Sequence, residues 1–208
     1  MTPPPTPSTR PAVGVNRSAR GAGAPRVSPR RQQLLDLAAN LFAERGFHGV
    51  SVTDLGAAAG ISGPALYKHF TSKDAILAEM LVQISEELLT IGTARAMAAA
   101  EPRAALHALV EFHVDFALNK PALIVVQDRD WASLPDDARE QVRATQRRYV
   151  ALWAELITQV RPGLTLVAAK AVAHATFGLI NSTPRSSRLP MEEMQAMLRG
   201  MALRALDV

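Results

Sequence analysis

The chain has 208 residues and a formal net charge of +4, and hydrophobic residues make up 48% of it. This length and composition suit one compact unit, or a small head domain joined to a larger body. The chain has no cysteine, which excludes disulfide frameworks, thiol catalysis and cysteine-rich zinc modules and fits a reducing cytoplasm. No apolar run approaches the roughly 20 residues that a membrane-spanning helix needs, so no membrane partner is expected.

The first 27 residues are predicted to form a disordered, basic arm. Residues 1–31 contain six arginines, no acidic residue and seven of the fourteen prolines, and the rest of the chain is therefore slightly acidic. Such a segment buries too little apolar surface to fold, and it lacks the apolar stretch of a secretory signal. Two interpretations stay open. The arm is a solvated leader, or its arginines contact DNA phosphates or enter a minor groove.

Several short helical patterns follow the arm. A helix is predicted to begin at Pro29 and to end at Gly46. Ser51 is a suitable N-cap for a second helix, which Gly60 ends with a positive φ. Ser62 caps a third helix of about seven residues, which is too short to be stable alone and therefore depends on its neighbours. A helix, a tight turn and a short polar-aromatic helix are typical of a helix-turn-helix that reads the DNA major groove.

These residues resemble the tetracycline-repressor (TetR) family of bacterial transcription regulators. The matching residues are Leu34…Ala38…Leu41-Phe42…Gly46-Phe47, then Val52-Thr53…Ala57…Ala59-Gly60, then Leu66-Tyr67-Lys68-His69-Phe70 followed by Ser72-Lys73. The resemblance is dense over residues 28–88, which would form the DNA-binding domain. Residues 89–208 would then form the effector-binding and dimerisation domain.

The resemblance implies a set of DNA-contacting residues. Thr53 and Lys73 would contact phosphates, and the groove-facing residues would be Ser62, Gly63, Pro64, Ala65, Tyr67, Lys68 and His69. Phe70 is expected in the core. The alternative is that Tyr67 is also a core anchor and Lys68 a solvated charge. Residues 62–70 contain no Arg, Asn or Gln for bidentate base contacts, so apolar contact with thymine methyl groups and shape readout are expected.

The rest of the chain predicts further helices. A longer helix capped by Thr71-Ser72 would link head and body, and later helices are expected at residues 102–119, 121–131, 136–160, 164–181 and 190–205. The fold class is all-α with about nine helices and no strand. The segment 164–181 is rich in small residues, and Met191, Met194, Leu198 and Met201 form a stripe on the last helix. These last two helices are expected to form a homodimer interface as a four-helix bundle.

The body also contains a candidate effector pocket. The residues proposed to line it are the aromatics Phe112, Phe116, Trp131, Tyr149, Trp153 and Phe177, together with His113, Arg129 and Asn181. Asp128 and Asp130 are further possible polar contacts, and ordinary core packing is the alternative. A mostly apolar and aromatic lining with few charges predicts a hydrophobic or amphipathic effector. Resemblance to lipid-responsive relatives adds acyl-CoA-like molecules.

Enzyme motifs are absent. His107, Glu111 and Asp115 share one helix face, but a solvated face explains them better than a metal site, and neither a P-loop nor GxGxxG occurs. No cofactor or metal is therefore expected. The sequence predicts a cytoplasmic, ligand-responsive repressor that binds a pseudo-palindromic, double-stranded DNA operator as a homodimer. The alternatives are an architectural or effector-independent DNA-binding protein and an all-α enzyme.

Overall fold

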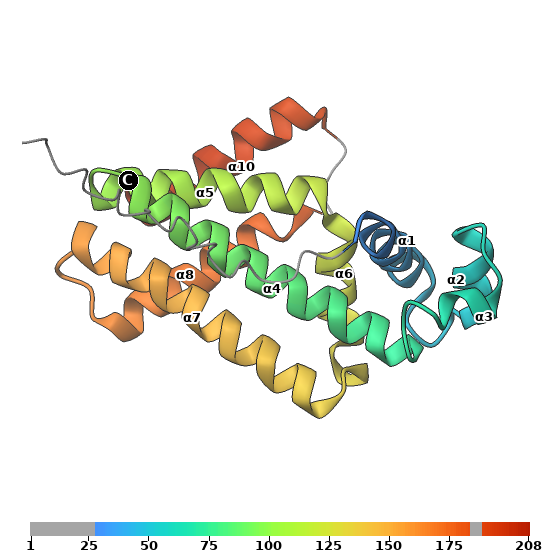
Figure 1. Cartoon of the computed structure of the whole chain (residues 1–208). Helices are drawn as coiled ribbons and strands as arrows, with labels where there is room; N and C mark the ends of the chain where they lie inside the picture. The colour runs from blue at the N-terminus through green and yellow to red at the C-terminus, as the bar shows by residue number, and fades with distance from the viewer. Residues whose placement is uncertain (1–27, 184–188) are drawn as a thin grey trace, which may run out of the picture.

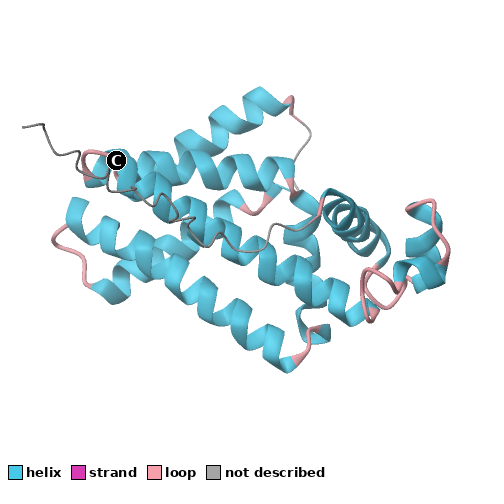
Figure 2. Cartoon of the chain, in the orientation of Figure 1, coloured by secondary structure: helices cyan, strands magenta, loops and turns pink. Residues whose placement is uncertain are grey.

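A computed structural model describes residues 28–183 and 189–208, so the arm predicted at residues 1–27 lies outside the described residues. Within those two ranges the chain is helical and has no strand, as predicted (Figure 1, Figure 2). The nine α-helices and one 3-10 helix are α1 (Pro29–Arg45), α2 (Val52–Ala58), α3 (Gly63–Leu66), α4 (Lys73–Ala98), α5 (Pro102–Asn119), α6 (Pro121–Asp130), η1 (Trp131–Ser133), α7 (Asp136–Val160), α8 (Leu166–Ile180) and α10 (Met191–Leu206).

The helix starts predicted in the head are confirmed. The side chains of Ser51, Ser62 and Ser72 each accept a hydrogen bond from the backbone N–H three residues later. Gly60 has a φ of +66°, which is the left-handed conformation expected after α2. The third helix is shorter than expected, because only four residues are α-helical and the chain then continues as turns to His69.

The head and the body share a hydrophobic core. The cluster that includes the buried side chains of α1 to α3 also contains Val126 from α6, Leu134 from the turn before α7, and Ala138 and Val142 from the start of α7. The 26-residue α4 runs from the head into the body (Figure 1). The head is therefore packed against α6 and α7 as well as being connected through α4.

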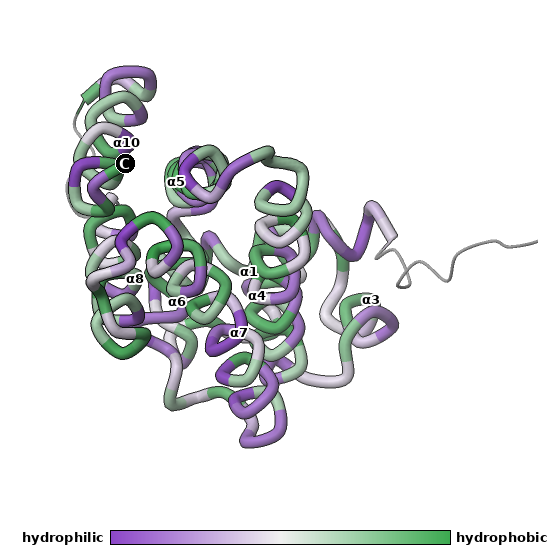
Figure 3. The backbone as a smooth tube through the Cα atoms, turned by 90° about the vertical axis from the view of Figure 1, so that its left-hand side faces the viewer, coloured by the Kyte–Doolittle hydropathy of each residue, from purple (hydrophilic) through white to green (hydrophobic). Residues whose placement is uncertain are grey.

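A second core lies between α5, α7, α8 and α10, and Trp153 is fully buried within it. The helices α4 and α7 approach closely at Gly92, where an added Cβ would lie 2.7 Å from the Tyr149 ring. Figure 3 shows α8 and α10 on the side of the molecule away from α3. Among the described residues, no helix is long and apolar enough to cross a membrane.

Candidate nucleic-acid interface and effector cavity

The residues predicted to contact DNA lie on the surface formed by α2 and α3. Thr53, Ser62, Pro64, Tyr67 and Lys68 are exposed, and the Tyr67 side chain is 55% exposed although it is large and aromatic. The other predicted groove residues, which are Gly63, Ala65 and His69, are half-buried. Leu66 and Phe70 are buried beneath them, as expected for Phe70. A short helix thus presents polar and aromatic side chains outward and is anchored by apolar side chains on its inner face.

Lys73 has a structural contact that the sequence did not indicate. Its ammonium donates hydrogen bonds to the carbonyl oxygens of Phe47 at 2.8 Å and Val50 at 2.9 Å. The same nitrogen lies 4.3 Å from the centroid of the Phe47 ring. Two of its three N–H groups therefore hold the loop between α1 and α2, and a phosphate could use only the third. The predicted phosphate contact of Lys73 stays a prediction.

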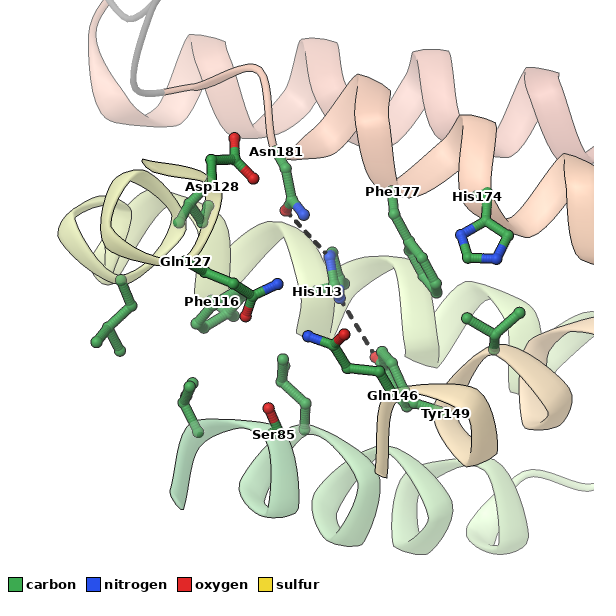
Figure 4. Close-up of a pocket in the computed structure, with 15 residues that line it drawn as sticks. Ser85, His113, Phe116, Gln127, Asp128, Gln146, Tyr149, His174, Phe177 and Asn181 are labelled. Atoms are coloured by element: carbon green, nitrogen blue, oxygen red, sulfur yellow. Dashed lines mark hydrogen bonds between the residues drawn. The ribbon is translucent and has the colours of Figure 1, made fainter. Parts of the chain in front are cut away.

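A cavity of about 210 Å³ lies in the body between α4, α5, α6, α7 and α8 (Figure 4). Its lining residues are Ile84, Ser85, Leu88, His113, Phe116, Leu123, Ile124, Gln127, Asp128, Gln146, Tyr149, Val150, His174, Phe177 and Asn181. Eight of these fifteen side chains carry a hydrogen-bonding group. Most of the lining surface is nevertheless apolar, as predicted, and the cavity is therefore amphipathic.

His113 is the central polar group of the cavity. Its Nε2 lies 3.2 Å from Asn181 Oδ1, and its Nδ1 lies 3.4 Å from the Tyr149 hydroxyl (Figure 4). Because the Asn181 oxygen can only accept, Nε2 carries the proton and the Tyr149 hydroxyl donates to Nδ1. Burial lowers the pKa of His113 from 6.5 to about 4 and raises the pKa of Tyr149. The imidazole is therefore neutral at pH 7.

Five of the nine residues predicted to form the pocket line this cavity, and these are His113, Phe116, Tyr149, Phe177 and Asn181. Their contact with an effector stays a prediction. Their rings pack closely, and Tyr149 and Phe177 are stacked with centroids 5.6 Å apart. Asp128, weighed as a polar contact, also lines the cavity.

The prediction is wrong for Phe112, Trp131, Trp153 and Arg129, none of which lines the cavity. Phe112 is on another face of α5, where the Arg95 guanidinium lies 4.9 Å from its ring centroid. Trp131 packs against the core of the head, and the guanidinium of Arg143 lies 5.5 Å from its ring centroid. Trp153 is fully buried behind the lining, edge-on to Phe177.

Arg129 points away from the cavity and holds the end of α1. Its guanidinium donates to the carbonyl oxygens of Phe42 and Ala43, which belong to the last turn of that helix. It also pairs with Asp130, whose carboxylate accepts a hydrogen bond from the Phe47 N–H at 3.3 Å. The last carbonyl groups of a helix lack the usual partner within it. Arg129 supplies a donor to the Ala43 carbonyl and a second donor to the Phe42 carbonyl, which also accepts the Gly46 N–H.

Four polar residues that line the cavity were not predicted from the sequence, and these are Ser85, Gln127, Gln146 and His174. Helical spacing could have indicated two of them, because Gln146 and His174 precede Tyr149 and Phe177 by three residues and lie on the same helix face. Figure 4 shows the amides of Gln127 and Gln146 reaching into the space near His113 from α6 and α7.

The helix face formed by His107, Glu111 and Asp115 contacts α10. Glu111 forms an ion pair with Arg199 at 2.6 Å, and Asp115 accepts a hydrogen bond from Gln195 at 2.7 Å. Within residues 28–183 and 189–208, no group of three or more acidic, histidine or cysteine side chains could hold a metal ion.

Two family models match the chain, one in the head and one in the body. The family model described as "Bacterial regulatory proteins, tetR family" matches residues 34–80. The model described as "Tetracyclin repressor-like, C-terminal domain" matches residues 99–186. The first match contains α2 and α3, and the second contains every cavity residue except the three that α4 supplies.

Two curated relatives and one solved structure are similar to the chain. The transcriptional repressor KstR2 of Rhodococcus jostii is 45% identical over 85 residues, which cover 40% of this chain and 41% of the relative. The transcriptional activator FasR of Mycolicibacterium smegmatis is 33% identical over 139 residues, which cover 66% and 61%. These matches span less than two thirds of each relative. The crystal structure of a TetR-family transcriptional regulator from Bordetella parapertussis has a TM-score of 0.78 at 25% identity, covering 87% of this chain and 96% of that one.

Burial of neutral His113 makes the stability of the protein depend on pH. Because the folded-state pKa lies below the unfolded value of 6.5, the unfolded state binds more protons as the pH falls. Neutral His113 therefore makes its full contribution to the free energy of unfolding above about pH 6.5. This contribution falls by up to about 3 kcal/mol as the pH is lowered from about 6.5 to about 4. Urea unfolding at pH 7 and pH 4.5 measures this loss.

The comparison variants are His113→Gln, which should lose less stability over this range than the wild type, and His107→Gln on the partly exposed face of α5. The interpretation fails if His113→Gln and His107→Gln show the same pH dependence.

Proposed function

This chain belongs to the tetR family of bacterial regulatory proteins, and we therefore propose that it is a dimeric, DNA-binding transcription regulator controlled by a small molecule. The observation that carries the proposal is the combination of two sites in one chain. A short helix with exposed polar and aromatic side chains lies at one end, and an amphipathic cavity lies in the body behind it.

The proposed DNA contact is made by α3 in the major groove. Tyr67 and Lys68, in the turn that directly follows α3, are exposed large side chains, and the half-buried Ala65 and exposed Pro64 are suited to contact thymine methyl groups. Two copies of the head would read the two halves of a pseudo-palindromic operator. We propose repression, because the relative with the higher identity is named a repressor, although the longer match is to a protein named an activator.

The proposed dimer interface is formed by α8 and α10. The outward face of α8 carries the exposed residues Leu166, Val167, Ala171, Ala175 and Gly178. On α10 the predicted methionine stripe divides, because Met194 and Leu198 pack inward whereas Met191 and Met201 are exposed, as is Met197. Exposed apolar side chains on two neighbouring helices indicate a surface that a partner covers. The small residues of α8 would allow a second copy to approach closely.

The proposed effector is a hydrophobic or amphipathic molecule that enters the cavity. An engineered apolar cavity of about 150 Å³ can bind benzene, so a cavity of about 210 Å³ accommodates a ring or a short acyl chain. Asp128 and His174 line the cavity and are exposed, which places them at its opening. If the effector is an acyl-CoA, its acyl group would occupy the cavity and the remainder would extend outward. The presence of a cavity favours this function over an effector-independent architectural protein.

The proposed response to the effector runs through α6. One face of this helix lines the cavity with Leu123, Ile124 and Gln127, and its end holds α1 through Arg129 and Asp130. A ligand that shifts α6 would therefore also shift the head. Such a ligand acts only to the extent that it binds the two conformations with different affinity.

The DNA-binding surface is tested by the double variant Tyr67→Ala/Lys68→Ala. We expect it to lose binding to a duplex that the wild type selects from a random-sequence library, because both side chains project from α3 without supporting the core. Mobility shift measures the affinity, and the helical circular dichroism spectrum should be unchanged. Arg147→Ala, a charge removal on the exposed face of α7, should bind normally. Unchanged affinity of the double variant would show that α3 is not the recognition helix.

The dimer interface is tested by Ala171→Arg or Ala175→Arg. A buried, unpaired charge is unfavourable, so each variant should be monomeric and bind the selected duplex weakly. Light scattering should give the wild type twice the chain mass of 22.4 kDa. The matched control is Ala104→Arg on the exposed face of α5, which should remain dimeric. A wild type that is monomeric at micromolar concentration contradicts the proposal.

The effector site is tested by the matched substitutions Phe177→Leu and Phe112→Leu. Fatty acids, acyl-CoA thioesters, steroids and a sugar control are screened for an increase in melting temperature and for release of the selected duplex. Phe177→Leu should weaken both effects because it removes a ring that lines the cavity, whereas Phe112→Leu should not. The assignment is wrong if only the sugar passes both tests, or if both variants respond equally.

A further inference from the structure

Arg31 makes an unusually complete set of contacts in the head. Its Nε and Nη2 each lie 2.5 Å from one carboxylate oxygen of Glu79, which is a bidentate pair. Its Nη1 donates to the carbonyl oxygen of His69, and its guanidinium carbon lies 4.2 Å from the centroid of the Phe70 ring. Both charged side chains are partly buried, with about a third of Arg31 and a quarter of Glu79 exposed.

These contacts join three helices at the proposed recognition helix. Arg31 lies in the first turn of α1, Glu79 lies on α4, and His69 ends the turns that follow α3. The His69 carbonyl is beyond the last hydrogen bond of those turns, so Arg31 supplies a partner for it. The neighbouring Arg30 donates in the same way to the carbonyl oxygen of Ala59, at 2.9 Å. Ala59 is the residue that follows the last residue of α2. From the sequence, Arg30 and Arg31 were counted among the six arginines of the basic N-terminal segment.

The orientation of α3 depends on such contacts, because four residues cannot form a stable helix alone. The buried side chains Leu66 and Phe70 fix its inner face, whereas Tyr67 and Lys68 are exposed to solvent. The segment between Phe70 and α3 is therefore held at its end by the guanidinium of Arg31. That guanidinium is itself held in one orientation by Glu79.

We propose that Arg31 and Glu79 are positioning residues that set the orientation of the recognition helix, and that Arg31 does not act as a phosphate contact. The proposal rests on the proposed DNA-binding function. According to this proposal, the acidic Glu79 is necessary for specific DNA binding, although its negative charge by itself repels DNA. Removal of a negative charge near DNA should otherwise strengthen binding.

The test compares Glu79→Gln with Glu44→Gln, which removes an exposed acidic charge from α1. Affinities are measured for the duplex selected by the wild type and for a random duplex, over a range of salt concentrations. Glu79→Gln should weaken binding to the selected duplex about tenfold, a change of about 1.4 kcal/mol, whereas binding to random DNA should be unchanged or tighter, as in Glu44→Gln. Binding to the selected duplex that is unchanged or tighter, as for Glu44→Gln, overturns the proposal.

Arg31→Gln separates positioning from direct contact with DNA. A positioning residue should leave the slope of log affinity against log salt unchanged, whereas loss of a phosphate contact lowers it by about 0.9. A lowered slope therefore overturns the proposal. Arg31→Lys keeps the charge but not the planar fork, so it should show the same loss of specificity as Glu79→Gln. Full specificity in Arg31→Lys also contradicts the proposal.

A measurement without DNA keeps this test separate from that of the proposed function. Amide hydrogen exchange in residues 66–70 should be faster in Glu79→Gln than in the wild type, and exchange in α7 should be unchanged. Equal exchange in residues 66–70 overturns the proposed positioning role. If the wild type selects no duplex, the proposed function fails, and the exchange result alone decides whether Arg31 and Glu79 hold α3.

Discussion

A helix of four residues has too few internal hydrogen bonds to persist in water, and the arrangement of the head follows from this constraint. The Ser62 cap, the buried Leu66 and Phe70, and the guanidinium of Arg31 together hold α3 against α1 and α4. Because these contacts depend on residues outside the helix, the direction of the side chains that it exposes is a property of the whole head. Such a surface can be rigid although the helix that presents it is short.

The same kind of contact joins the head to the body. Arg31 donates to a carbonyl at the end of the turns that follow α3, and Arg129 donates to two carbonyls at the end of α1. Both guanidinium groups are paired with a carboxylate, Glu79 or Asp130, so neither charge is left without compensation. Arginine suits this role because its planar fork can bind a carboxylate and a backbone carbonyl together.

The cavity in the body combines an apolar surface with an organised polar network. Asn181, His113 and Tyr149 satisfy one another, so the rings around them are held in place before any ligand enters. Since His113 is neutral at pH 7, this network offers oriented dipoles rather than a fixed charge. An amphipathic ligand could therefore place its apolar part against Phe116 and Phe177 and its polar part toward Gln127 and Gln146.

The sequence alone determined the starts of the head helices and the all-α class. Caps such as Ser51 and Ser62 act on backbone groups three residues away, so local sequence is sufficient to identify them. Only the tertiary structure decided which side chains line the cavity. Helical periodicity identifies an apolar face but not the helix that it meets, so Phe112 and Trp153 were indistinguishable from Phe116 and Phe177. The direction of Arg31 and Arg129 likewise depended on carbonyl groups that are distant in the chain, at separations of 38 and up to 87 residues.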